Sequence, residues 1–121
     1  MREQLIPTDR VYVIQRRAQG VVCTVSEGAA FSKPLPLRLD LWNHAPTGFE
    51  FGYGGSGPAQ LALAMLADCS GDGPALAYHQ AFKWAVIARL PADGGSLTET
   101  FVRDVLAKLQ SDRAAQQARN N

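Results

Sequence analysis

The sequence has almost no excess of positive over negative charge. It holds 12 Lys and Arg residues against 11 Asp and Glu residues in a chain of 121, which gives a formal net charge of +1. A chain this close to neutrality has no overall field to draw it to nucleic acid or to an anionic membrane. Arg16 and Arg17 make one segment basic, but it lacks the basic stripe with interleaved aromatics of a nucleic-acid footprint. Nucleic-acid binding is therefore an unfavoured alternative, and both arginines remain candidate interaction residues.

Cysteine, histidine and long apolar runs are also scarce. Cys23 and Cys69 form no C-x-x-C pair, and together with His44 and His79 they lack the close spacings of a structural zinc site. No stretch approaches the roughly 18 apolar residues of a membrane span, and the first residues lack the apolar segment of a secretory signal. The sequence therefore predicts no metal site, no cofactor and no membrane partner, and it predicts a cytoplasmic protein with reduced thiols.

No set of side chains has the pattern of a catalytic centre. The nearest approach is Cys69 as nucleophile and His79 as base, with Asp68 or Asp72 as the orienting group. Cys69, however, falls on the apolar stripe of its predicted helix, and His79 falls between two apolar positions of the next one. These positions favour a core thiol and a half-buried, hydrogen-bonded imidazole. We therefore predict no catalytic residue and favour a role without enzymatic activity.

What is present fits one globular domain that begins with strands. The hydrophobic content of 46% and charged content of 19% are those of a single-core protein of this length. β-branched and aromatic residues predict strands at 11–16 and 21–25, joined as a hairpin through Gly20. The segment 26–36 contains two prolines, which is typical of a connector or the start of an edge strand.

Two further strands are predicted before the first helix. Leucines at every second position from 35 to 41 indicate a strand with one apolar face. Phe49 and Phe51 flank Glu50, which indicates a short strand with both aromatic rings on one side. A turn of Asn, Pro and Gly residues separates the two over 43–48.

Helical patterns occupy the rest of the chain. The first helix is predicted from Pro58 to a glycine-containing turn at 70–73, and the second from Pro74 to a point before Pro91. The S-x-x-E capping box at 96–99 predicts the start of a third helix. Strands followed by helices predict an α+β fold, in which an antiparallel sheet of three or four strands has three helices packed on one face. Residues 1–110 form this domain, and 111–121 form a polar tail that is either a solvated helical extension or disordered.

The most informative motif is the glycine-rich turn between the last predicted strand and the first helix. Gly52, Gly54 and Gly57 match the G-x-G-x-x-G dinucleotide fingerprint, and the strand–turn–helix context is the one that motif requires. Pro58 removes one of the amides, a second helix follows where a parallel strand is needed, and no lysine follows as in a Walker loop. The turn is therefore either a tight junction in which packing requires glycine or an anion site at a helix start.

The second alternative defines a set of candidate ligand-binding residues. They are Gly54, Gly55, Ser56, Gly57, Gln60 and His79. The corresponding function is a small nucleotide- or anion-binding protein that uses the Gly52–Gln60 loop and the helix start.

Three large aromatic residues define a second set of candidates. Trp42, Tyr53 and Trp84 belong either to the core and its rim or, if exposed together, to the anchors of an interface. Without a catalytic set or a strong charge, we favour a non-enzymatic module that binds another protein or complex.

Three segments resemble a small family classed as a domain of unknown function. They are GYGGSGPAQLALA at 52–64, HQ-x-FK at 79–83 and VIA-x-LP at 86–91. The resemblance extends over about residues 49–106, and the chain departs from it at 69–73, where such members carry longer acidic stretches. The family resembled occurs in prokaryotic chromosomes, mobile elements and phages and has no established activity, so no catalytic residue is carried over. The resemblance implies an accessory or inhibitory role in a phage or mobile element, for example in counter-defence.

Overall fold

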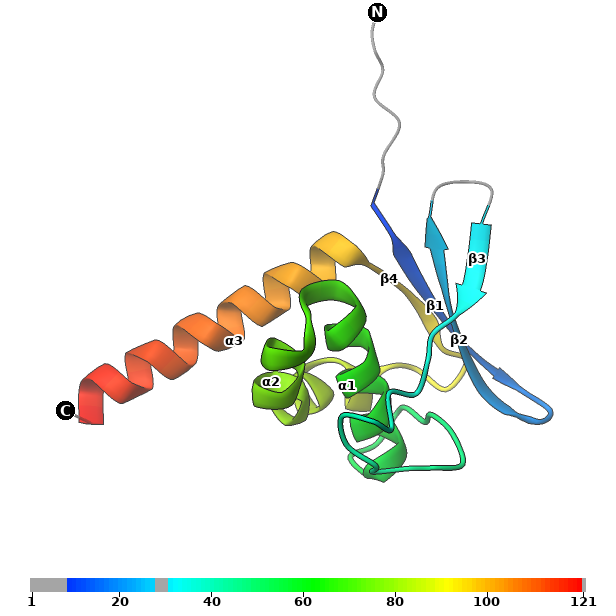
Figure 1. Cartoon of the computed structure of the whole chain (residues 1–121), viewed down its shortest axis with the longest axis horizontal. Coiled ribbons are helices and arrows are strands. Elements are labelled where there is room, and N and C mark those ends of the chain that lie inside the picture. The colour runs from blue at the N-terminus through cyan, green and yellow to red at the C-terminus, as the bar shows by residue number, and fades with distance from the viewer. Residues whose placement is uncertain (1–8, 28–30, 121) are drawn as a thin grey trace, which may run out of the picture.

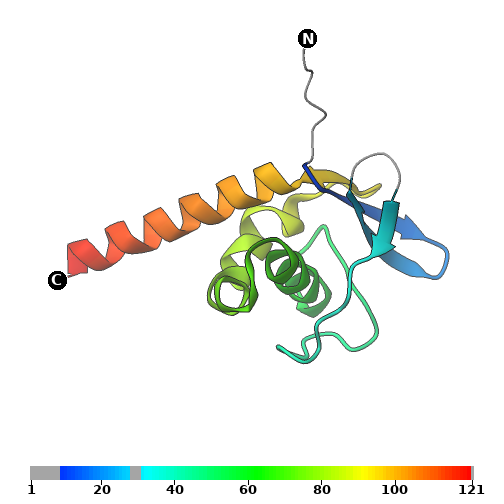
Figure 2. The same cartoon turned by 45° about the horizontal axis from the view of Figure 1, so that its top comes forward.

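The computed structural model describes residues 9–27 and 31–120. It consists of a four-stranded antiparallel sheet with the α-helices gathered on one side of it (Figures 1 and 2). This arrangement confirms the predicted α+β fold. The first eight residues of the predicted domain, and residues 28–30 of the predicted connector, lie outside the described residues.

The sheet has the strand order β3-β2-β1-β4. β1 (Val11–Arg17) and β2 (Gly20–Glu27) form the predicted hairpin. Gly20 has φ +127°, a backbone conformation that side chains disfavour, which explains glycine at the end of this turn. β3 (Phe31–Pro34) pairs with β2 at one edge, and β4 (Gly95–Thr98) pairs with β1 at the other.

Two of the predicted strands are wrong. In the leucine run 35–41 Leu35 is buried, Leu37 and Leu41 pack against the core partly buried, and the chain turns at Arg38, whose φ is +57°. The segment 49–51 makes a single isolated bridge, from Phe49 to Val21. An alternating pattern indicates that one face of a segment is apolar, but it does not show that a partner strand is available. In this protein the leucines hold a loop against the core.

One strand was missed, because the capping box at 96–99 is not the start of a helix. Residues 95–98 pair with β1 as β4, and the strands therefore do not all precede the helices. α3 (Glu99–Asn120) begins two residues later than a cap at Ser96 would place it, and the Thr98 hydroxyl accepts a hydrogen bond from the Phe101 amide at 3.1 Å. The capping motif is local, whereas β4 is stabilised by a strand more than 80 positions away in the chain.

The three α-helices are present, with small shifts at their starts. α1 (Ser56–Ser70) and α2 (Asp72–Ala85) each begin two residues before the predicted proline, and Gly71, with φ +97°, joins them. A 3-10 turn, η1 (Ile87–Arg89), follows α2. α3 continues to Asn120 with residues 110–120 exposed, so residues 111–120 of the predicted tail are the solvated helical extension.

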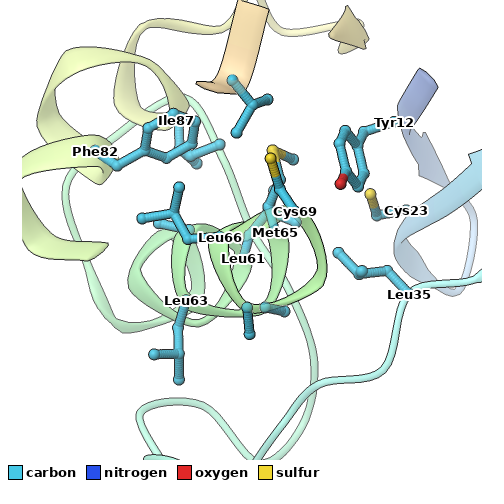
Figure 3. Packing of buried hydrophobic residues seen from close by; sticks show 14 of the residues in the cluster. Tyr12, Cys23, Leu35, Leu61, Leu63, Met65, Leu66, Cys69, Phe82 and Ile87 are labelled. Atoms are coloured by element: carbon cyan, nitrogen blue, oxygen red, sulfur yellow. The ribbon is translucent and has the colours of Figure 1, made fainter. Parts of the chain in front are cut away.

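α1 occupies the middle of the core, as its apolar circumference predicts. Figure 3 shows Tyr12, Cys23 and Leu35 on its sheet side and Phe82 and Ile87 on the side of α2. Because α1 is covered on both sides, most of its residues are buried, including the polar Gln60.

A polar network ties the sheet to α1. Asp68 of α1 accepts a hydrogen bond from the Tyr12 hydroxyl at 2.8 Å and pairs with the Arg10 guanidinium, which also lies 3.7 Å from Glu99 of α3. Burial and the neighbouring Asp68 raise the pKa of Tyr12, so the phenol stays protonated and donates. The two carboxylates and Arg10 thereby join β1, α1 and α3.

Candidate functional site

The glycines of the turn before α1 are packed against side chains. The Trp84 ring occupies the place that a Cβ on Gly54 would need, and a Cβ on Gly57 would lie 2.5 Å from Glu50 Cβ. A Cβ on Gly55 would lie 2.7 Å from the Tyr53 ring. Close packing therefore gives a firm physical reason for glycine at position 57, whereas Gly54 and Gly55 face rings that are more than half exposed; anion binding by the amides of these glycines stays a prediction.

Gln60 holds the loop that precedes the glycine turn against α1. Its side chain is fully buried, and its Oε1 accepts hydrogen bonds from the amides of His44 at 2.8 Å and Ala45 at 3.0 Å. Its Nε2 donates to the carbonyls of Leu37 at 2.6 Å and Trp42 at 3.0 Å. All these partners are main-chain groups, so the amide fixes the position of Trp42 and His44 instead of facing a ligand.

His44 and His79 form a hydrogen-bonded pair across this loop and α2. Their Nε2 atoms lie 3.0 Å apart, and Nδ1 of His79 lies 2.8 Å from the Ala75 carbonyl. A carbonyl oxygen only accepts, so Nδ1 of His79 carries a hydrogen and Nε2 of neutral His79 is an acceptor. His44 therefore donates through Nε2. Only one hydrogen fits between the two Nε2 atoms, which limits the pair to one added positive charge.

The environment favours the neutral form of His44. His79 is 2% exposed and His44 is half-buried. Burial lowers the pKa of His44 below its ordinary value, and the nearby His79 and Lys83 lower it further.

The pH dependence of stability follows from His44. Folding lowers the pKa of His44, so the folded protein binds fewer protons than the unfolded chain, in which histidine has a pKa of about 6.5. The free energy of unfolding should therefore fall as the pH is lowered from 7.5 to 5.5. Urea unfolding at both pH values should show a smaller fall in His44→Gln, whose amide still donates to His79. An equal fall in both proteins would contradict this assignment.

Trp42 lies flat on the histidine pair. Its ring is stacked on His44, with centroids 5.0 Å apart and planes 10° apart, and is tilted against His79 at 5.6 Å. The indole nevertheless remains 52% exposed. One face of Trp42 is thus fixed by protein while much of the ring meets solvent.

Lys83 lies one turn beyond His79 on α2 and is only 7% exposed. Its Nζ is 4.4 Å from the centroid of the Trp84 ring, a cation–π contact. Across residues 9–27 and 31–120, no carboxylate pairs with it. Trp84 covers this ammonium, rests on Gly54 and is 58% exposed.

These contacts form two groups that come together on α2, where Lys83 follows His79 by one turn, and we call the six side chains the tryptophan–histidine surface. Its members are Trp42, His44, Tyr53, His79, Lys83 and Trp84. Loop 42–44, the glycine turn and α2 supply them, and Gln60 holds the loop in place.

Comparison with known protein families gives a match over most of the chain. The family of unknown function DUF6166 matches residues 12–116, from β1 to most of α3. The chain belongs to DUF6166. No curated protein and no solved structure matches it significantly. Membership of DUF6166 assigns no activity, so the function must be argued from the geometry of the site.

The DUF6166 domain brings together only part of the predicted site. Trp42, Tyr53, Trp84 and His79 lie on the tryptophan–histidine surface, and Gly54 supports it. His44 and Lys83 were not among the predicted ligand-binding or interaction residues. Lys83 follows His79 by four residues, which puts them on one helix face and was a usable signal, whereas the partner of His44 lies 35 residues away and left no local pattern.

The remaining candidates lie elsewhere in the DUF6166 domain. Arg16 pairs with Glu50 at 3.0 Å and lies over the Phe51 ring at 4.6 Å, and Arg17 bonds Gln15 at the hairpin. Ser56 is exposed at the start of α1. The two arginines are therefore not part of the tryptophan–histidine surface, and their role in binding stays a prediction.

The two cysteines of this DUF6166 domain lie in its interior. Cys23 and Cys69 are buried free thiols, and burial raises the pKa of Cys23 to about 12 and also raises that of Cys69. The described residues contain no group of three or more His, Cys, Asp or Glu side chains that could hold a metal ion, and none of their helices could cross a membrane. The two histidine Nε2 atoms alone, next to the Lys83 cation, make a poor cation site.

Proposed function

We propose that this protein is a non-enzymatic binding module that docks another protein on its tryptophan–histidine surface. The observation that carries the proposal is that Trp42, Tyr53 and Trp84 are each more than half exposed. Large aromatic side chains provide most of the binding energy at many interfaces.

The aromatic rings are fixed from behind before any partner arrives. Trp42 is stacked on His44, and Trp84 rests on Gly54 with Lys83 against its ring. Rigid side chains lose little conformational entropy on binding, so more of the contact energy appears as affinity.

The biological setting is part of the proposal. We place the protein in the cytoplasm as an accessory or inhibitory protein of a phage or mobile element, for example in counter-defence against its host. The support for this setting is the resemblance of the 52–64, 79–83 and 86–91 motifs to a family that occurs in such elements. Genes of a phage or a defence locus beside the coding gene would strengthen it.

A pull-down from the native host tests the docking surface. The unchanged protein should recover one stoichiometric partner, and Trp42→Ala combined with Trp84→Ala should weaken its binding several hundredfold, since two anchors of about 2 kcal/mol each are removed. Phe101→Ala is the matched control, because Phe101 is also an exposed aromatic residue, 43% exposed on α3. Recovery that is equal in the double variant and in the control would refute the proposal.

A further inference from the structure

We propose that Lys83, together with the His44–His79 pair, forms a binding site for a small oxyanion, either a carboxylate or a phosphate group. The proposal goes beyond protein docking, because a free anion would bind here whether or not a protein partner covers the surface. It also differs from an anion site at the amides of the glycine turn, because the positive charge comes from α2.

The first argument is the uncompensated charge of Lys83. Lys83 as a whole residue is only 7% exposed, and buried charges in proteins are ordinarily paired. The Lys83 Nζ lies 4.4 Å from the centroid of the Trp84 ring. The acidic residues of the adjacent segments are engaged elsewhere, Asp72 with Arg38 at 3.2 Å and Glu50 with Arg16 at 3.0 Å. An anion at this position would supply the missing counter-charge.

The second argument is that Nδ1 of His44 is available for a hydrogen bond to a ligand. Because His44 donates through Nε2 to His79, its Nδ1 is left without a hydrogen-bond partner among residues 9–27 and 31–120. Neutral His44 presents an acceptor there, and protonation at Nδ1 turns it into a charged donor. Lys83 lies close enough to oppose that protonation electrostatically. An anion bound to Lys83 would offset the repulsion between the ammonium and protonated His44. His44 could then take up a proton and give the anion a second cationic contact.

The third argument is selectivity against cations and neutral ligands. Lys83 repels a metal ion from the two Nε2 atoms, and Nδ1 of His79 is occupied by the Ala75 carbonyl. The indoles of Trp42 and Trp84 flank the cluster with partly exposed rings, and apolar walls strengthen an ion pair by excluding water. The charge of Lys83, the donor that His44 offers when protonated, and the apolar indole rings therefore favour an oxyanion.

Nuclear magnetic resonance of the isolated full chain tests the proposal without any protein partner. Inorganic phosphate and sodium acetate are titrated separately at pH 6.5 and constant ionic strength, with sodium chloride as the reference salt. The imidazole nitrogens of His44 and the indole N–H of Trp84 should shift saturably with one or both anions, and His44 should take up a proton. The stronger response of the two identifies phosphate or carboxylate as the preferred group.

Matched variants separate binding at Lys83 from a general salt effect. Lys83→Met keeps the apolar stem and should weaken binding at least tenfold, and Lys83→Arg should retain it. Lys108→Met removes an exposed lysine that pairs with Asp112 on α3 and should change nothing. The absence of a saturable shift in the unchanged protein with both anions would overturn the proposal, as would equal affinity in Lys83→Met. If Lys83→Met does not fold, the unchanged protein and Lys83→Arg still decide the question. A failed pull-down together with a saturable shift would reject only the docking function.

Discussion

Replacing Gln60 by leucine is expected to lower the free energy of unfolding by about 3–5 kcal/mol. The leucine side chain fills a similar volume, but it leaves the amides of His44 and Ala45 and two loop carbonyls without their partner. Each buried main-chain group left unpaired costs about 1–3 kcal/mol, and some regain water when the loop moves. Urea unfolding measures the loss.

The matched control for this substitution is Gln80→Leu. Gln80 is an exposed glutamine on α2, where surface substitutions change stability by about 0.5 kcal/mol or less. Hydrogen exchange adds a local measure, because the His44 and Ala45 amides should lose their protection in Gln60→Leu. If those amides stay protected and the stability stays within 0.5 kcal/mol, then Gln60 does not hold the loop.

Gly57→Ala is expected to destabilise the protein by about 2–3 kcal/mol with no ligand present. The new Cβ would meet Glu50 Cβ at 2.5 Å and the Glu50 amide nitrogen at 3.1 Å, so the glycine turn must shift, and overpacking of this kind costs about 1–3 kcal/mol or more. Thermal unfolding of the purified variant in a buffer free of phosphate measures the effect.

Gly73→Ala is the companion to this variant. Gly73 lies in the first turn of α2, and a Cβ there meets nothing within 4 Å, so alanine should be neutral or stabilise by up to about 1 kcal/mol. A loss of stability in Gly57→Ala but not in Gly73→Ala would show that close packing requires glycine at position 57. Equal stability of the two variants would instead leave the glycine motif without its steric explanation.

Elements set by neighbouring residues were predictable from the sequence. The β1–β2 hairpin follows from alternating apolar residues and Gly20, and the position of α1 follows from its glycine-rich start and apolar circumference. Elements that depend on distant partners were not predictable. β4 exists because the edge of β1 offers it hydrogen bonds, and the leucine run 35–41 is a loop because Gln60 takes up the carbonyls of Leu37 and Trp42.

The same distinction applies to the site. The chemistry of Trp42, Tyr53 and Trp84 marked them as interface candidates, although sequence could not place them at the surface. Exposure is a tertiary property, and the structure supplies it. The contact between His44 and His79 joins a loop to a helix, so neither residue showed its partner in the sequence.

The central claim, that the tryptophan–histidine surface docks a protein partner, is tested most directly by photo-crosslinking in native host cells. p-Benzoylphenylalanine is placed at Tyr53, 52% exposed beside Gly54, and in a second strain at Phe101, 43% exposed on α3. The account predicts one discrete covalent adduct from position 53 and none from position 101. No adduct from position 53, or the same adduct in equal yield from position 101, would contradict it.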